Sequence, residues 1–186
     1  MKLPLNAALI ATTLALASTA MAKETITTKE VNAAQQAWCD ALVALGKTHE
    51  KGGDVKAHAT KILDEAYAYD HGGVFFKPTL THGEQTFRTT KEGALAYFVG
   101  GDEDFPDDKG FALKPWVNVT YDNLGEGDEG IQIHDDLAIT MGHVTLTGKD
   151  GTKVTVEKTF IFKKDDDGKL RLILHKSALP YSPEKK

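Results

Sequence analysis

The sequence contains a single cysteine, which limits what can stabilise the fold. Cys39 is the only thiol among 186 residues, so no disulfide can form within the chain. The usual ligands of a structural zinc site are also missing, because there is no second cysteine and no His-x-x-x-His pair. We therefore expect no metal and no cofactor. Cys39 stands next to Trp38, and this apolar setting predicts a small buried hydrophobe rather than a reactive thiol.

An excess of positive charge is absent too, and so is any long apolar run after the first twenty residues. The formal net charge is −5, with acids and bases interspersed, so nucleic acid and anionic membranes are not expected partners.

At the start of the chain, Lys2 precedes an apolar run over residues 3–17, and Ala20-Met21-Ala22 has the small-x-small form of a cleavage site. Residues 1–22 are predicted to be a secretory signal of bacterial type. Residues 23–186 would then be one periplasmic or secreted domain.

Three helices are predicted in the first hundred residues. Two of them open with a capping box, Thr27-x-x-Glu30 and Thr89-x-x-Glu92, and the middle one opens with Asp54 as its N-cap. Apolar residues then recur at three and four positions, as on the buried face of a helix. The first helix is expected to end near Gly46 and the last at Gly100-Gly101.

Strand patterns dominate the rest of the chain. Residues 111–121, 131–147 and the hairpin over 152–177 alternate apolar and polar side chains, and a shorter strand-prone stretch lies within residues 67–78. Helices first and antiparallel strands afterwards predict an α+β domain with its helices on one face of a curved sheet.

Cations fall on the apolar face of the hairpin. Lys158 alternates with Val156 and Phe160, and on the return strand Lys176 follows Leu172 and Leu174 in the same rhythm. These lysines either reach water from the rim of the sheet or line a pocket that binds an anion.

Other residues could join such a pocket. His143 alternates with Ile139 and Met141, so it would share the space if that face is the inner one. A core histidine bonded to a carbonyl group is the commoner outcome. We also expect Trp116 and Tyr97 to line the mouth.

Acid–base candidates are less well placed. His134-Asp135-Asp136 and Asp70-His71 could supply a general base, but adjacent residues on a strand face opposite sides. An exposed acidic turn is the favoured interpretation for Asp135-Asp136. The acidic residues of 102–108 do not have the spacing of a calcium-binding loop, so a solvated charge run is favoured there.

Several strings resemble the nuclear transport factor 2-like superfamily. They are Phe76-Lys77-Pro78-Thr79, Arg88-Thr89-Thr90 and the closing strand over residues 174–180. The resemblance implies a cone-shaped sheet of the cystatin-like roll type wrapped around a helix, with a cavity at its open end. SnoaL-like proteins and the association domain of calcium/calmodulin-dependent protein kinase II look most similar. In that association domain the last strand carries an arginine that lines the pocket, and Lys176 stands in its place.

These patterns leave three functions open. The first is a non-catalytic pocket or assembly domain that binds a small anionic or polar molecule through Lys158, Lys176 and His143. The second, which the superfamily's ketosteroid isomerases and dehydratases suggest, is a cofactor-free lyase, isomerase or cyclase using His134, Asp135, Asp70 or His143. The third is a purely structural role. A homodimer through the outer sheet face is expected, because Ile161 and Ile173 face away from the core.

Overall fold

The computed structural model describes residues 25–183, and the predicted signal segment lies outside them. The helices are α1 (Thr28–Glu50), α2 (Val55–Ala66) and α3 (Lys91–Val99), with 3-10 turns η1 (Tyr69–His71), η2 (Gly83–Gln85) and η3 (Phe111–Leu113). The strands are β1 (Phe75–Lys77), β2 (Trp116–Asn123), β3 (Ile131–His134), β4 (Leu137–Gly148), β5 (Lys153–Lys164) and β6 (Leu170–Ala178). Within the described residues, no helix is long and apolar enough to cross a membrane.

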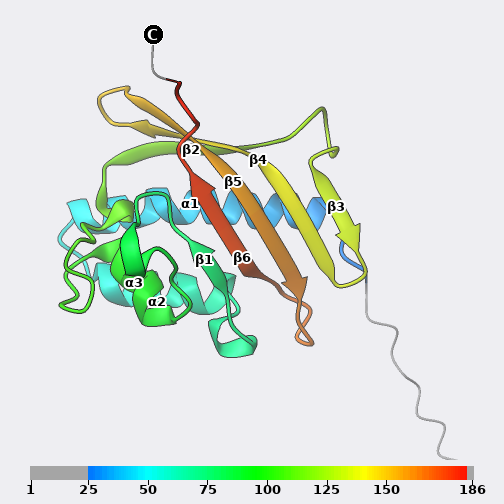
Figure 1. Ribbon diagram of the computed structural model, residues 1–186, viewed down its shortest axis with the longest axis horizontal. Coiled ribbons are helices and arrows are strands. Elements are labelled where there is room, and N and C mark those ends of the chain that lie inside the picture. Colours follow the sequence, from blue (N-terminus) through cyan, green and yellow to red (C-terminus); the bar gives the residue numbers. More distant parts are fainter. Residues whose placement is uncertain (1–24, 184–186) are drawn as a thin grey trace, which may run out of the picture.

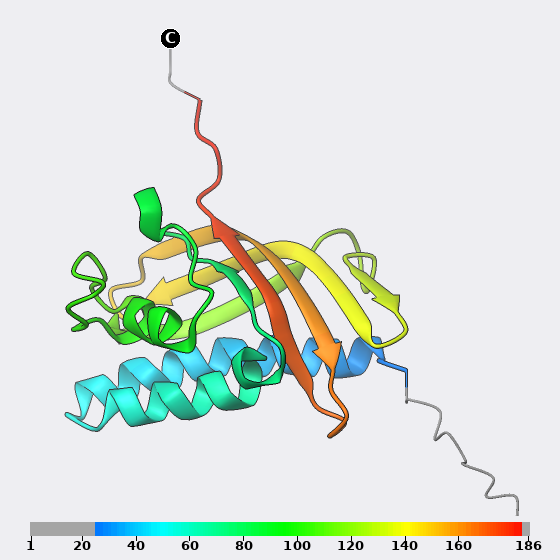
Figure 2. The same cartoon turned by 60° about the horizontal axis from the view of Figure 1, so that its bottom comes forward.

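The strands form one mixed sheet in the order β1-β6-β5-β4-β2, with β3 paired to β4. All pairs are antiparallel except β1 with β6, which is parallel. The sheet curves over α1, and none of the three α-helices covers its opposite face (Figures 1 and 2). The predicted α+β class and the curved sheet are therefore confirmed, with the parallel β1–β6 pair as an addition.

Local capping explains where the helices begin. The Thr27 hydroxyl accepts a hydrogen bond from the Glu30 amide, and the Glu30 carboxylate accepts one from the Thr27 amide, as the capping box predicted. At α3 the N-cap is Thr90 rather than Thr89, because the Thr90 hydroxyl accepts from the amide of Gly93.

The first helix continues four residues beyond its predicted end. It runs to Glu50, and Gly46 lies inside it as a packing position. A Cβ atom at Gly46 would stand 2.8 Å from the carbonyl oxygen of Lys114, so the missing side chain lets the turn after η3 approach the helix.

Two predicted strands are shorter than their sequence patterns. η3 occupies the start of the predicted strand over 111–121, so β2 begins only at Trp116. The predicted strand over 131–147 is divided into β3 and β4 by a turn in which Asp135 has φ 53°. Asp135 is exposed there, which confirms the interpretation of an acidic turn.

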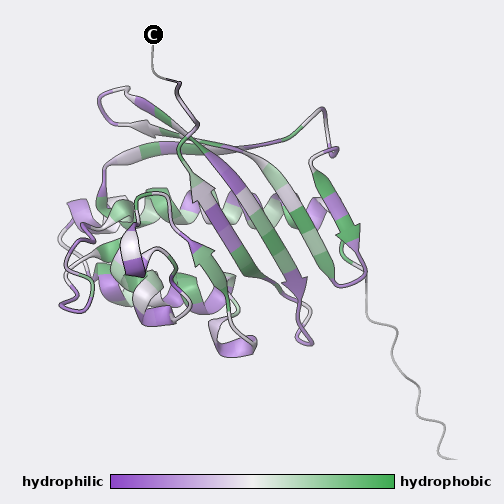
Figure 3. Ribbon diagram, in the orientation of Figure 1, coloured by the Kyte–Doolittle hydropathy of each residue, from purple (hydrophilic) through white to green (hydrophobic). Residues whose placement is uncertain are grey.

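Along β4 the inner face is the one opposite to that expected for His143. Ala138, Thr140 and Val144 are buried, whereas Met141 and His143 are exposed. The register pairs His143 with Glu157 of β5, on the outer side. Apolar residues occupy both faces of this strand, with Ile139 and Met141 on the outer face and Ala138 and Val144 on the inner one, and hydrophobic residues recur along it in Figure 3. Alternation alone therefore did not decide which face is buried.

A β-bulge reverses the predicted alternation in β6. Ile161 pairs with Leu174 and Phe162 pairs with Leu172, which leaves Ile173 as an extra residue. After the bulge His175 and Ser177 point inward, and Lys176 is exposed opposite Thr159. The prediction that Lys176 faces the core is therefore wrong.

Candidate functional site

A line of polar side chains crosses the apolar core between α1 and the sheet. The Lys158 amine lies 2.8 Å from Nε2 of His175, and the Nδ1 atom of His175 lies 2.9 Å from the Tyr67 hydroxyl. That hydroxyl accepts a hydrogen bond of 2.9 Å from the indole N–H of Trp38. All four side chains are buried, so Lys158 faces the interior as the sequence predicted.

Burial changes the ionisation of this line. It lowers the pKa of Lys158 to about 7, because a buried ammonium loses its hydration. Burial also holds the pKa of His175 well below its usual value, and the nearby Lys158 lowers it further. The imidazole is therefore neutral. Cys39 behaves as predicted: it is fully buried, and burial raises the pKa of its thiol to about 12.

Three hydroxyl groups gather beside this line. The parallel β1–β6 pair brings the chain that follows β1 alongside the end of β6, where the Thr79 hydroxyl lies 2.6 Å from the Ser177 hydroxyl. Tyr97 of α3 points its hydroxyl towards Thr79 and Leu80, and burial raises the pKa of this phenol to about 12. The Tyr97 oxygen is buried and makes no hydrogen bond of ordinary geometry with residues 25–183. We call Thr79, Ser177 and Tyr97 the hydroxyl cluster.

An open cleft of about 250 Å³ borders the cluster at Tyr97. Tyr97 is the side chain that the cleft and the cluster share. The cleft is lined by Leu80, Tyr97, Asp107, Asp108, Lys109, Gly110, Phe111 and Lys114. Tyr97 stacks on Phe111 with ring centroids 5.5 Å apart, so an aromatic wall borders the polar cluster.

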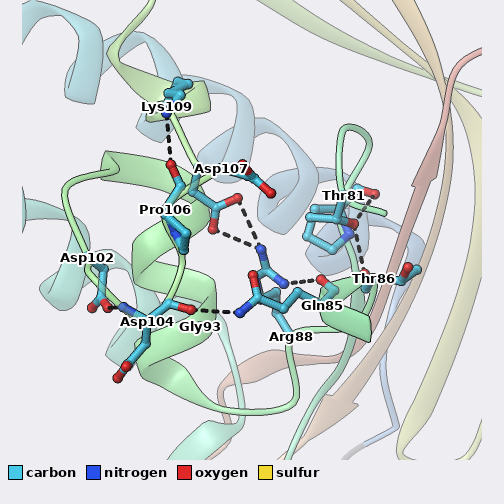
Figure 4. A network of polar contacts seen from close by, with 12 residues as sticks. Thr81, Gln85, Thr86, Arg88, Gly93, Asp102, Asp104, Pro106, Asp107 and Lys109 are labelled. Atoms are coloured by element: carbon cyan, nitrogen blue, oxygen red, sulfur yellow. Dashed lines mark hydrogen bonds and ion pairs between the residues drawn. The ribbon is translucent and has the colours of Figure 1, made fainter. Parts of the chain in front are cut away.

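A buried ion pair between Arg88 and Asp108 stabilises one wall of the cleft. Arg88 donates to both carboxylate oxygens of Asp108, at 3.1 and 2.9 Å, and also donates to the carbonyl oxygen of Gln85 (Figure 4). Its guanidinium group lies 4.5 Å from the centre of the Phe105 ring. The acidic stretch over 102–108 is thus not simply solvated, because the Asp108 side chain is only 6% exposed.

The remaining predicted site residues lie elsewhere. Trp116 is buried and donates its indole N–H to the carbonyl oxygen of Phe111. His134 is exposed at the end of β3. Asp70 is bound to Lys91 at 2.7 Å, and His71 lies 3.8 Å from an oxygen of Asp165.

Sequence reasoning missed the polar residues that surround Lys158. Thr79, His175 and Ser177 stood in the strings that carried the superfamily resemblance, but none of them was assigned to the site. The signal that could have found them is the alternation of His175 and Ser177 at the end of β6, which only the bulge places on the inner face. Among the described residues, no group of three or more His, Cys, Asp or Glu side chains is arranged to hold a metal ion.

Comparison with known proteins assigns the family. The family model of metal-independent carbonic anhydrases matches residues 29–179. A metal-independent carbonic anhydrase of Nostoc sp. (strain PCC 7120) is 51% identical over 165 residues, which cover 88% of this chain and 78% of the relative.

Solved structures agree with this assignment. The iota-carbonic anhydrase of a cyanobacterium, complexed with bicarbonate, has 50% identity and a TM-score of 0.82, covering 89% of this chain and 99% of that chain. A putative dehydratase of the NTF2-like family from Streptomyces avermitilis, 12% identical with a TM-score of 0.50, covers 83% of this chain and 96% of its own and shares the fold alone. The predicted superfamily fold is thus confirmed. Within it, the match over most of the described residues shows that this chain belongs to the metal-independent carbonic anhydrase family.

Proposed function

We propose that this protein interconverts carbon dioxide and bicarbonate at the hydroxyl cluster of Thr79, Ser177 and Tyr97. The family to which the chain belongs and the bicarbonate in the related cyanobacterial structure support this reaction. Addition of water to carbon dioxide is a lyase-type reaction, so the family favours the cofactor-free lyase over the non-catalytic binding domain. The small anionic ligand expected from the sequence would then be bicarbonate.

The observation that carries the proposal is the gathering of three buried hydroxyl groups, among which the Tyr97 oxygen makes no hydrogen bond of ordinary geometry within residues 25–183. A poorly satisfied buried hydroxyl costs stability, and a ligand held by the cluster would supply a better hydrogen bond. Hydroxyl groups both donate and accept. The hydroxyl groups of the cluster can therefore accept a hydrogen bond from a bound water molecule. They can also donate hydrogen bonds to the oxygens of bicarbonate.

The surroundings suit a substrate that begins apolar and ends charged. The ring centroid of Tyr97 lies 5.8 Å from that of Phe76 and 5.5 Å from that of Phe111, so aromatic surface flanks the cluster. Carbon dioxide is favoured in such surroundings, and donors in a site of low dielectric stabilise a developing oxyanion more strongly than they would in water.

Removal of single hydroxyl groups tests the proposal. Ser177→Ala, Thr79→Val and Tyr97→Phe should each lower kcat for carbon dioxide hydration by about 10² to 10³, the usual loss for one oxyanion donor. Stopped-flow hydration with a pH indicator measures this. Thr145→Val is the matched control, because Thr145 shares a similar hydroxyl pair with Thr155 on the outer face, 3.1 Å apart, and should keep full activity.

Two further results would decide between the alternatives. Activity that survives exhaustive dialysis against a chelator is expected, and loss of activity that zinc restores would contradict the proposal. Wild-type protein that binds ¹³C-bicarbonate but shows no hydration would favour the non-catalytic binding domain instead.

A further inference from the structure

The hydroxyl cluster alone does not account for the lysine buried behind it. Lys158 is 4% exposed, and no carboxylate of residues 25–183 forms an ion pair with it. A buried ammonium without a counter-ion is expensive, so such a lysine normally has a specific reason to be there. Its remaining stabilisation comes from the rings of Trp38 and Phe160, whose centres lie 4.7 and 5.9 Å from Nζ.

The groups around Lys158 leave both of its protonation states accessible. The titratable neighbours are Cys39 of α1, Tyr67 at the end of α2, Lys77 of β1 and His175 of β6. On β4 the residue paired with Lys158 is Gly142, which carries no titratable group. Burial and the positive charge of Lys77 disfavour the ammonium form, which brings the pKa of Lys158 to about 7. Near neutral pH the amine and the ammonium form are therefore both populated.

The hydrogen bonds of His175 suit either form. With its proton on Nε2, the neutral imidazole donates to the lone pair of the amine and accepts from the Tyr67 hydroxyl at Nδ1. With its proton on Nδ1, it accepts at Nε2 from an N–H of either the amine or the ammonium and donates to the oxygen of Tyr67. In this second arrangement the lone pair of the amine is free to take up a proton. Lys158 can thus gain and lose a proton without leaving a hydrogen bond of His175 unmade.

Lys158 also lies next to the hydroxyl cluster. It is directly opposite Ser177 in the β5–β6 pair, and both side chains are buried on the inner face of the sheet. Opposed residues of neighbouring strands have Cβ atoms only about 5 Å apart, so the flexible lysine amine is within reach of a molecule held by Ser177.

We propose that Lys158 is the proton acceptor for carbon dioxide hydration in this protein, and that His175 positions it. The inference rests on the proposed function. The oxygen of a water molecule held by the hydroxyl cluster bonds to the carbon of carbon dioxide, and one C–O π electron pair moves onto oxygen. The proton that this water loses passes to the lone pair of the Lys158 amine. Bicarbonate and an ammonium group result, and the ammonium later releases its proton to solvent buffer. The positive charge forms beside the anion as the anion appears.

The decisive variant is Lys158→Met, which keeps the length and volume of the side chain without a titrating group. Removal of a general base typically lowers the rate by about 10² to 10⁴, so we expect a loss of kcat in that range. Binding of ¹³C-bicarbonate, followed by NMR, should persist in the variant. In the wild type, kcat should rise with pH through a midpoint near 7, and this step should disappear in the variant. Methylamine or imidazole in the buffer should restore part of the lost rate.

Two comparison variants separate this role from a general effect on the fold. Lys153→Met removes an exposed lysine of the same strand and should leave both kcat and its pH profile unchanged. His175→Gln keeps a group that can donate or accept, and it should move the midpoint of the pH profile rather than abolish turnover.

The outcomes can be told apart. If Lys158→Met retains the wild-type rate and pH profile, Lys158 is not the proton acceptor, while the proposed carbon dioxide hydration stands. If wild-type protein shows no hydration, both fail. If Lys158→Met does not fold, a His175→Gln variant with an unchanged midpoint overturns the proposal.

Discussion

At the scale of single residues, the proposed chemistry depends on how burial changes Lys158. The same amine on the outer surface would stay charged at every physiological pH. Inside, beside His175 and Trp38, it becomes a group that titrates near neutrality. The hydroxyl cluster depends on burial in the same way, because the buried Tyr97 oxygen lies in surroundings of low dielectric, where a hydrogen bond to a developing charge is stronger than in water.

Burial of Lys158 predicts a pH dependence of stability. Its pKa is lowered in the folded state, so between about pH 7 and 10.5 the unfolded chain binds more protons than the folded one. From pH 7 to about 8.5 the free energy of unfolding should therefore rise with pH, by roughly 1 kcal/mol per pH unit. Urea denaturation in this range measures it, below the pH at which Cys39 and tyrosines such as Tyr67, whose pKa values burial raises in the folded protein, begin to ionise in the unfolded chain and oppose the rise.

Variants assign this slope to one residue. Lys158→Met should lose the rise, whereas Lys153→Met, an exposed change on the same strand, should retain it. If the free energy of unfolding changes with pH in the same way in wild type and Lys158→Met, the pKa of Lys158 is not lowered in the folded protein. Below about pH 6.5 the free energy of unfolding should fall in wild type and in both lysine variants, because the pKa of His175 is lowered in the folded protein. The histidine then binds a proton in the unfolded chain, whereas the buried imidazole of the folded protein stays neutral.

At the scale of elements, two irregular features shape the site. The bulge at Ile173 turns His175 and Ser177 inward, and the loop between α3 and η3 forms one wall of the cleft. This loop leaves α3 through Gly100, whose φ of 66° suits a residue without a side chain. Its firm anchor is the pair of Arg88 with Asp108.

Breaking that anchor should lower the stability of the fold and loosen the loop between α3 and η3. Asp108→Asn leaves the Arg88 charge buried without its carboxylate, and loss of one partner of a buried pair typically costs about 3 to 5 kcal/mol. We expect a lower midpoint in urea and faster proteolysis between residues 100 and 110. Asp107→Asn is the control, because this neighbouring carboxylate is 76% exposed and should change stability by less than about 1 kcal/mol. Equal effects of the two substitutions would contradict an anchoring role.

At the scale of the whole molecule, the outer face of the sheet is apolar enough to suggest an interface. Met141 of β4 is 53% exposed and Phe75 of β1 is 74% exposed, with Ile161 and Ile173 half-buried on β5 and β6. None of the three α-helices covers this face (Figure 2). We propose that two copies of the chain pair through it, as the sequence led us to expect.

Light scattering after size exclusion tests the pairing. The wild type should elute as a dimer, and Met141→Lys should weaken dimerisation at least about tenfold, because it places a charge in an apolar contact. Leu80→Lys is the matched control: Leu80 is 54% exposed and lines the cleft with Tyr97 of α3 rather than the outer face of the sheet, so the dimer should stay intact. A wild type that is monomeric at all concentrations would remove the outer face as an interface.

Much of the fold follows from local signals in the sequence. Capping at Thr27 and Asp54 placed two helix starts, and helices followed by alternating strands predicted the α+β class. Lys158 and Tyr97 could be singled out as site residues because a lysine on an apolar face and an aromatic beside a loop are visible in one dimension. These features involve residues close together in the chain, where backbone preference and periodicity act.

The remaining site was decided by contacts between distant segments. Ser177 meets Thr79, 98 positions away, only because β1 adds to β6 in parallel. His175 faces Lys158 only because the extra residue Ile173 shifts the alternation of β6. A strand with apolar residues on both faces has two energetically similar orientations in isolation, and packing against α1 selects between them. The sequence by itself therefore determined the class of fold and its buried cation, whereas the tertiary structure decided which polar groups that cation meets.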